Sequence, residues 1–225
     1  MNRRFTALVL SAAVVLAGAA TAQAQTVTPA GNFGGSLPAG SFGGTGNPTN
    51  PVVTHTGDAG VTLGLAAQQR YTSPAVTYSN DGIFHAMSGI STGAPPLTGG
   101  GDGNVGFAAW NFDYFVGGAN ANNFFTLFVG PVPGNPTGTQ LAFNFTGNAH
   151  DSSNLHYFSS AFDPNATGVY SFALYQYTTS ERTAAMDHVA INVDVTTTPE
   201  PSSMALLGTG FVGLAGFVKR RAKLS

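Results

Sequence analysis

Apolar and polar residues alternate with a period of two along several parts of the chain. The segments 61–67 and 189–195 place an apolar side chain at every second position, which is typical of a strand with one buried face. The run AVTYSNDGIFHAM places Asn80, Asp81 and Gly82 between two further strand-like stretches. It predicts a hairpin, because Asn and Gly tolerate the positive φ that tight turns require.

Further stretches have the apolar character of strands and are separated by Gly, Pro or Asn. They are residues 105–116, 124–129, 140–145, 155–158 and 169–177. Without convincing helical periodicity in this region, the pattern predicts an all-β domain, a β-sandwich for which the jelly roll is one arrangement. We expect the core to contain Phe107, Trp110, Phe112, Tyr114, Phe125, Leu127, Phe143, Phe145, Tyr170, Phe172 and Leu174.

Residues 25–57 differ from the segments that follow them. They are rich in Gly, Pro, Asn, Ser and Thr and show little apolar periodicity, so we expect this leader to be mostly loop. The sandwich itself is expected over residues 58–198.

Charge is scarce and unevenly distributed along the 225 residues. Charged residues make up 8% of the chain, and six of the eight Lys and Arg lie in its two ends. Between residues 25 and 198 only Arg70 and Arg182 stand against nine Asp and Glu, a net charge of −7. Nucleic acid and anionic lipid are therefore poor partners for this region, because neutralising phosphates takes clustered Lys and Arg. The absence of cysteine excludes disulfides and thiol chemistry.

The N-terminal end has the order of a secretory signal peptide. Arg3 and Arg4 precede an apolar run over 7–20, and the small residues Ala22 and Ala24 follow it. This order predicts a signal peptide over residues 1–24, which signal peptidase removes by cleavage after Ala24.

Residues 202–218 contain no charge and predict a single transmembrane helix. At 1.5 Å per residue the segment spans roughly 25 Å, just enough to cross a membrane. The basic tail 219–225 follows at once, and the positive-inside rule places it in the cytoplasm and the domain outside. Pro199 and Pro201 should hold the chain extended above the membrane, because proline fixes its own φ and lacks an amide hydrogen.

The order of Pro-Glu-Pro, apolar helix and Arg-rich end over residues 199–225 resembles the tripartite PEP-CTERM sorting signal of Gram-negative bacteria. The resemblance implies processing by an exosortase, a membrane protease or transpeptidase, and then release or attachment at the cell surface, often in bacteria that make exopolysaccharide. It also implies that the recognition residues are Pro199, Glu200 and Pro201. The positive-inside rule makes the membrane stop Lys219, Arg220 and Arg221.

The middle of the chain carries a second, less specific resemblance. Blocks such as DGIFHA and AAWNFDYFV, within residues 58–195, resemble ectodomains of PEP-CTERM proteins of unassigned function. This resemblance brings no activity and no catalytic residue with it.

Short motifs inside the domain do not assemble into a recognisable catalytic set. The run GDGNVG at 101–106 matches G-x-G-x-x-G, but the strand before it and the helix after it that a pyrophosphate site needs are missing, so we interpret it as a loop. The run AGSFG around Ser41 is close to a nucleophile elbow, yet it lies in the Gly-rich leader without a strand-to-helix turn.

Carboxylates and histidines are weak candidates for catalysis or metal binding. A glycosidase needs two facing carboxylates, and the sequence leaves open whether Asp113, Asp151 and Asp163 pair in space. The histidines of NAHDSSNLHYF have no standard zinc spacing. Asp102 and Asn104 offer oxygen ligands for a structural calcium ion, which stays an open alternative because the EF-hand pattern is absent. We therefore expect neither a catalytic site nor a cofactor.

Two interpretations of function follow from the sequence. The first is a non-catalytic protein of the cell surface or extracellular matrix, exported across the inner membrane, held there for a time by its helix, and linked to exopolysaccharide or biofilm. The alternative is a carbohydrate-binding module, calcium-dependent or not, for the polysaccharide of the producing cell. Exposed coplanar Trp or Tyr would favour the module, whereas burial of Trp110, Tyr114 and Tyr170 would count against it.

Overall fold

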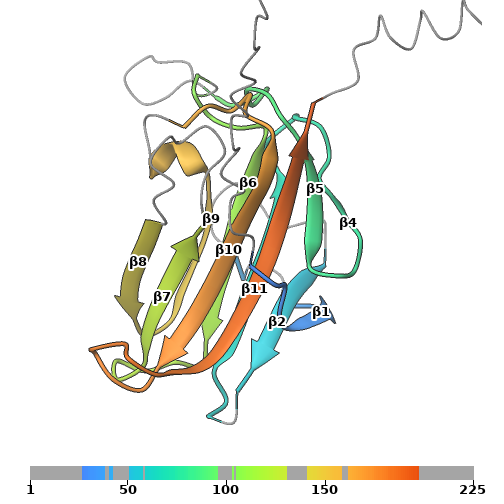
Figure 1. The fold of residues 1–225 in the computed structure, drawn as a ribbon. Coiled ribbons are helices and arrows are strands. Elements are labelled where there is room, and N and C mark those ends of the chain that lie inside the picture. The colour runs from blue at the N-terminus through green and yellow to red at the C-terminus, as the bar shows by residue number, and fades with distance from the viewer. Residues whose placement is uncertain are drawn as a thin grey trace, which may run out of the picture.

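The computed structural model describes residues 27–38, 41–42, 51–57, 59–95, 103, 105–130, 141–158 and 162–197. They form a β-sandwich of two sheets with a shared apolar core (Figure 1). The five-stranded sheet has the order β1 (Asn32–Gly35), β2 (Val52–Thr56), β3 (Thr62–Gln69), β6 (Trp110–Gly117) and β9 (Ala149–Ser153). The six-stranded sheet has the order β4 (Thr77–Tyr78), β5 (Ile83–Met87), β11 (Ala185–Thr196), β10 (Gly168–Tyr177), β7 (Phe124–Val129) and β8 (Leu141–Thr146). The prediction of an all-β sandwich is confirmed.

Strands β10 and β11 form the centre of the six-stranded sheet and show why alternation predicted them. Phe172 pairs with Ile191 and Leu174 with Val189 in the antiparallel ladder, and all four side chains are fully buried. Because cross-strand partners project to the same side of a sheet, the apolar positions of both strands form one continuous inner face.

The aromatic residues predicted for the core join the two sheets. Phe112 of β6 stacks on Phe172 of β10 with 4.6 Å between ring centroids, and Trp110 meets Tyr170 edge-on at 5.3 Å. Eight of the predicted core residues are buried, and the other three pack half-buried against the core: Tyr114, Phe143 and Phe145. Phe107 is buried as well, but it lies outside this main cluster.

The hairpin around Asn80 is confirmed. β4 and β5 pair antiparallel, and the backbone has φ of 61° at Asn80 and 83° at Gly82. A side chain at position 82 would collide with Pro29, since its Cβ would lie 2.4 Å from the proline Cβ. Glycine is therefore required at the end of this turn by both conformation and space.

Two strand predictions are corrected. Residues 155–158 were expected to form a strand, but Leu155–Tyr157 is the 3₁₀ helix η1, whose N-cap Asn154 accepts a hydrogen bond from the His156 amide. The strand at this place, β9, ends two residues earlier. The predicted strand 105–116 begins only at Trp110, because the residues before it form a turn in which Gly106 has φ of 78°.

The leader contributes more structure than its composition predicted. It contains β1 and β2, and Ala30 bridges to Ala190 of β11 through two backbone hydrogen bonds of 3.0 and 2.9 Å. Residues 27–35 therefore contact both sheets at one edge of the sandwich. The passage of the chain from one sheet to the other requires glycine at position 31. The φ of Gly31 is 130°, and an added Cβ would lie 2.9 Å from a methyl group of Val53.

The jelly-roll arrangement does not describe this sandwich. β5 and β11 pair in parallel, from Asn192 with Ile83 to Thr196 with Met87, whereas jelly rolls are antiparallel. No helix within the described ranges is long and apolar enough to span a membrane. The predicted signal peptide 1–24 and transmembrane helix 202–218 lie outside those ranges.

Candidate functional site

The end of the sandwich at which β11 finishes carries the C-terminal segment, and we call it the exit end. β11 ends at Thr196, three residues before Pro199. The Ser88 amide donates a 2.8 Å hydrogen bond to the Thr196 carbonyl, so the strand is held to its last residue. The predicted recognition residues Pro199, Glu200 and Pro201 lie outside the described part of the chain, as do Lys219, Arg220, Arg221, Ala22 and Ala24.

Backbone hydrogen bonds tie the loops of the exit end to one another. The Gly89 amide donates to the Pro164 carbonyl, the Ala109 amide to the Gly89 carbonyl, and the Arg70 amide to the Ala109 carbonyl. Loops that lie far apart in the sequence are thus joined into one surface beside the end of β11. Figure 1 shows β5 and β11 finishing at this same end.

Arg70 is packed inside the exit end between two aromatic rings. Its Cζ lies 4.5 Å from the ring centroid of Phe107 and 4.9 Å from that of Tyr71, and the residue is only 4% exposed. Its Nε has no hydrogen-bond partner, and no ion pair joins it to a carboxylate among the described residues. Cation–π contacts of desolvated groups contribute about 2 kcal/mol, so Arg70 stabilises the loops rather than presenting a charge to solvent.

A buried polar network lies on the outer face of the five-stranded sheet. Gln68 Nε2 donates to Asp113 Oδ1 at 3.1 Å and to Ser152 Oγ at 2.8 Å. Asn111 Nδ2 also donates to Ser152 Oγ at 3.2 Å, and Asn111 Oδ1 accepts from Asn154 at 2.9 Å. All five side chains are buried.

Asp113 is the titratable centre of this network. Burial raises the pKa of Asp113 to about 8, and hydrogen bonds from Ser152 and Gln68 oppose that shift only in part. The carboxyl group is therefore neutral at pH 7, and its Oδ2 is without a hydrogen-bond partner. A buried neutral acid has the protonation state of a general acid, but it needs access to a substrate, and Asp113 is fully buried.

The carboxylates considered for a glycosidase do not pair with Asp113. In the β6–β9 ladder Asp113 lies opposite Ser152, whereas Asp151 lies opposite Tyr114. Successive residues of a strand project to opposite faces, so Asp113 and Asp151 lie on opposite faces of the sheet, and the charge of Asp151 acts on Asp113 only by adding to the rise of its pKa. Asp151 instead accepts a 2.7 Å hydrogen bond from Ser153 Oγ, and Asp163 caps its own turn by accepting from the Asn165 amide.

The other chemical candidates take structural places. Ser41 Oγ donates a 2.6 Å hydrogen bond to the Pro38 carbonyl within a turn, away from any helix. His156 packs against the Phe107 ring at 4.6 Å. No group of three His, Cys, Asp or Glu with metal-binding geometry occurs among the residues that the structure places. Asp102 and Asn104, the calcium candidates, lie outside those residues.

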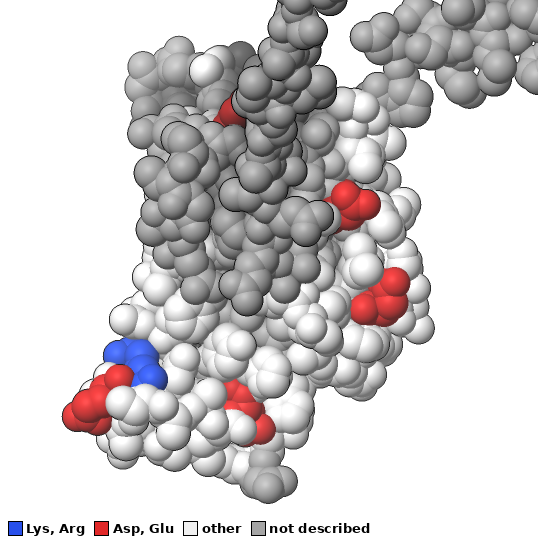
Figure 2. All heavy atoms as spheres, viewed as in Figure 1, with Lys and Arg blue, Asp and Glu red and all other residues white. Residues whose placement is uncertain are grey.

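Aromatic residues on the outer face of the six-stranded sheet form a small platform that sequence reasoning missed. Tyr175 of β10 and His188 of β11 are ladder partners and stack with 5.1 Å between centroids and 11° between planes. Phe128 of β7 meets Tyr175 edge-on at 5.6 Å. The sequence places both residues at outward positions of two correctly predicted strands. Only the register between β10 and β11 shows that their rings are neighbours. Over the described part of the face in Figure 2, charged side chains are few, and most of the surface is uncharged.

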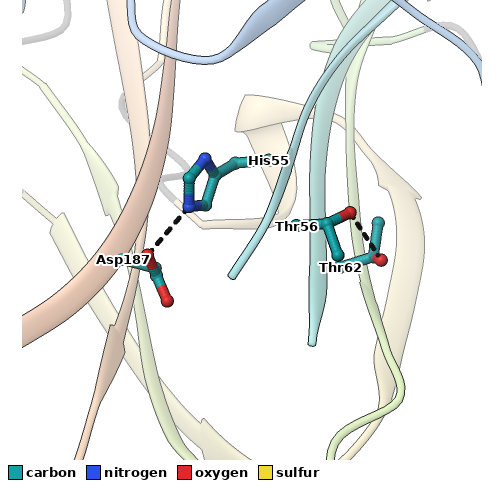
Figure 3. Close-up of polar contacts among 4 residues, drawn as sticks. All are labelled: His55, Thr56, Thr62 and Asp187. Carbon is teal, nitrogen blue, oxygen red and sulfur yellow. Dashed lines mark hydrogen bonds and ion pairs between the residues drawn. The ribbon is translucent and has the colours of Figure 1, made fainter. Parts of the chain in front are cut away.

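One polar pair links the sheets at the end opposite to the exit end. His55 Nε2 of β2 and Asp187 Oδ1 of β11 lie 2.8 Å apart, and Thr56 Oγ1 lies 3.0 Å from Thr62 Oγ1 beside them (Figure 3). The Asp187 carboxylate also occupies the place where a side chain at Gly57 would project. Both members of the pair are partly exposed, and the pair joins the two sheets at their edge.

Comparison with known proteins identifies the C-terminal segment. A family model described as the PEP-CTERM protein-sorting motif matches residues 197–221, which begin directly after β11. The search of curated proteins and the search of solved structures returned no match. The matched residues include Pro199, Glu200 and Pro201 and the basic cluster from Lys219 to Arg221. The chain is thus an exported protein that carries a PEP-CTERM sorting signal and is a substrate of an exosortase-type membrane enzyme.

Proposed function

We propose that this protein is a non-catalytic component of the cell surface or extracellular matrix, delivered there by exosortase processing and associated with exopolysaccharide or biofilm. The observation that carries the proposal is the sorting motif at residues 197–221, directly after the last strand of the sandwich. In this scheme the signal peptide 1–24 is cleaved after Ala24, and the segment 202–218 holds the chain in the inner membrane until it is processed.

The sorting residues have distinct roles in this proposal. Pro199 and Pro201 keep the chain extended, because their φ angles are fixed and they offer no amide to a strand or helix. Glu200 presents the one charge of the recognition site to the exosortase. The cluster Lys219, Arg220 and Arg221 sets the depth of the helix by staying in the cytoplasm.

The environment of the acidic residues supports a non-catalytic domain. Asp113 is fully buried and neutral at pH 7, and Asp151 projects from the other face of the same sheet. Two carboxylates that act on a glycosidic bond must face one substrate from opposite sides at close range. These two residues do not meet that requirement.

The decisive experiment follows processing in the native host. We expect a variant with alanine at Pro199, Glu200 and Pro201 to accumulate at full length in the membrane fraction, whereas the wild type is processed and found at the surface or in the medium. Leu207→Ile in the predicted helix is the control and should be processed normally. Immunoblots of membrane and released fractions decide the matter, and normal release of the triple variant would refute the proposed recognition role.

Carbohydrate binding is the second candidate function, and one observation favours it. Tyr175 and His188 present a stacked pair on an outer sheet face, and aromatic planes of this kind stack on sugar rings. Trp110 and Tyr170, by contrast, are buried in the core, and Tyr114 is half-buried against it, so two of the three residues first considered for this role are removed. The platform is small, so the candidate ranks below the surface protein without a ligand.

A glycan array with the exported protein tests this candidate. Binding to polysaccharide of the producing cell that is lost in Tyr175→Ala, but kept in Tyr157→Ala on another surface, would support the platform. Equal binding by both variants would show that the ligand binds elsewhere on the domain. Repeating the array with a calcium chelator shows whether carbohydrate binding depends on calcium.

A further inference from the structure

The sandwich ends very close to the segment that is expected to enter the membrane. Five residues, 197–201, separate the end of β11 from the uncharged segment that begins at Ser202. Fully extended, they reach at most about 18 Å. Until the chain is processed, the exit end is therefore held next to the outer face of the membrane, and the other end of the sandwich points away from it.

Exposed apolar side chains are concentrated at this same exit end. Among the described residues four large apolar side chains are strongly exposed, and three of them are Ile90 (49%), Val105 (65%) and Tyr157 (62%). The fourth, Met186 (52%), lies at the start of β11. Ten residues of strand, ~33 Å, separate Met186 from the exit end.

The three exposed residues surround Phe107 and form one surface, which we call the Phe107 patch. Ile90 forms a β-bridge with Ala108, and the Ser91 amide donates to the Phe107 carbonyl at 2.8 Å. The Tyr157 ring lies 4.9 Å from the Phe107 ring, and Val105 precedes Phe107 by two residues. Arg70 supports the patch from within, through its contact with the Phe107 ring.

We propose that the Phe107 patch contacts the outer lipid surface of the membrane while the sorting tail is still uncleaved. This inference rests on the proposed function, because it requires residues 202–218 to be inserted in the bilayer. Aliphatic side chains and a tyrosine with its polar hydroxyl are residue types that partition into the membrane interface. The contact turns the sandwich so that the short segment with Pro199, Glu200 and Pro201 lies at the membrane surface.

The negative charge of the domain and the small area of the patch make the contact with lipid weak and reversible. The region between the sorting ends has a net charge of −7, so anionic lipid gives no electrostatic attraction, and three side chains supply a small apolar area. Such a contact forms when the tail raises the effective concentration of the domain at the surface. Cleavage removes the tether, and the domain then leaves the membrane.

A lipid surface is favoured over a protein partner by the position of the patch. The patch lies at the end that the short connection brings to the bilayer, and its exposed members are apolar rather than charged. A second copy of the chain would have to enter the narrow zone between the domain and the membrane, and the exosortase enters it to act on Pro199, Glu200 and Pro201. Both are treated as alternative outcomes below.

The test uses single cysteines in the full chain, which has none of its own. Val105→Cys, Tyr157→Cys and Met186→Cys are each labelled with an environment-sensitive fluorophore and reconstituted in phosphatidylcholine vesicles. We expect the labels at 105 and 157 to shift to the blue and to lose most of their emission when brominated lipid is included. The label at 186 should do neither, and unchanged fluorescence of Trp110 verifies the fold of each variant.

Three outcomes would overturn the proposal. If the labels at 105 and 157 behave like the label at 186, the patch does not reach lipid. If they shift to the blue without lipid quenching, in proportion to protein density or only with exosortase added, a protein covers the patch. If they stay quenched after proteolysis of the tail, the tether does not control the contact.

A fourth variant separates failure of this inference from failure of the proposed function. A label at Leu207→Cys must be quenched from within the bilayer if residues 202–218 form the anchor. Quenching at 207 without quenching at 105 and 157 refutes the patch and leaves the sorting function intact. Absence of quenching at 207 refutes the anchor, and the membrane contact with it.

Discussion

Phe112 and Asp113 are neighbours in β6, and both side chains are fully buried, but they lie on opposite faces of the five-stranded sheet. On the inner face Phe112 stacks on Phe172 of the other sheet. On the outer face Asp113 belongs to a network with Gln68 and Ser152. One face is held by apolar packing between sheets and the other by hydrogen bonds within one sheet.

The leader is one reason why the outer face differs from an ordinary solvent-facing surface. Leu37 packs over the bare backbone of Gly64, and Phe42 meets Phe115 edge-on at 6.3 Å, both on this outer face. Polar side chains that lose water must find partners within the protein, because an unpaired buried polar group costs about 1–3 kcal/mol. Burial alone therefore does not predict how a face is stabilised.

At a fixed pH, the largest expected effect is on the inner face. Phe112→Ala should lower the free energy of unfolding by about 3–5 kcal/mol, because it leaves a cavity between the two sheets beside Phe172. Phe112→Leu is the matched control and should cost less. Urea unfolding followed by the fluorescence of Trp110, the only tryptophan, measures both, and equal losses would mean that the site collapses around the smaller side chain.

The second prediction concerns pH and the outer face. The pKa of Asp113 is raised from 3.8 to about 8, so the folded state keeps a proton that the unfolded state releases. The free energy of unfolding should therefore fall as pH rises between these values, by about 1.4 kcal/mol per pH unit. Asp113→Asn cannot release a proton and should remove this slope.

The pH dependence is measured by urea titrations of both proteins across that range. Other groups titrate alike in the two proteins, so the difference between their curves reports Asp113. Parallel curves would show that the carboxyl group is ionised in the folded state and that its network is solvated.

The smallest of the three effects is expected at Asn154, where the outer network meets the exit end. Its Nδ2 donates to the Trp110 carbonyl at 2.8 Å and to Asn111 Oδ1 at 2.9 Å, and its Oδ1 accepts from the Ala108 amide. Asn154→Ala should cost about 1–3 kcal/mol, because these buried groups lose their partners. Asn148→Ala removes an exposed hydrogen bond to the Ala119 amide and should cost less. Similar thermal shifts for both variants would contradict a buried network.

Strands with their own alternation could be predicted from the sequence, whereas strands that depend on a neighbour could not. β10 and β11 repeat an apolar residue every second position, so their existence and inner face were correctly predicted. β9 reads AHDSS and has no apolar repeat; it is a strand because it pairs with β6. The short β2 was hidden in a Gly-rich and Pro-rich leader for the same reason.

Among the candidate functional features, too, some could be predicted from the sequence and others could not. The sorting motif was readable from residues 197–221 alone, because it is a linear signal that a membrane enzyme meets in an extended chain. The Phe107 patch was not readable, since Ile90, Val105 and Tyr157 lie in three separate segments of the sequence that a β-bridge, a backbone hydrogen bond and a ring contact bring together. The Tyr175 and His188 pair likewise required the ladder register.

By itself, the sequence determined the sorting of the protein and the all-β character of its domain, because charge order and hydrophobic period are local properties of the chain. Only the tertiary structure decided that β5 and β11 run in parallel, that the pKa of Asp113 is raised and that the exit end exposes Ile90, Val105 and Tyr157. Each of these depends on which distant segments meet. Desolvation, which raises the pKa of Asp113, is a property of the packed environment and not of the residue.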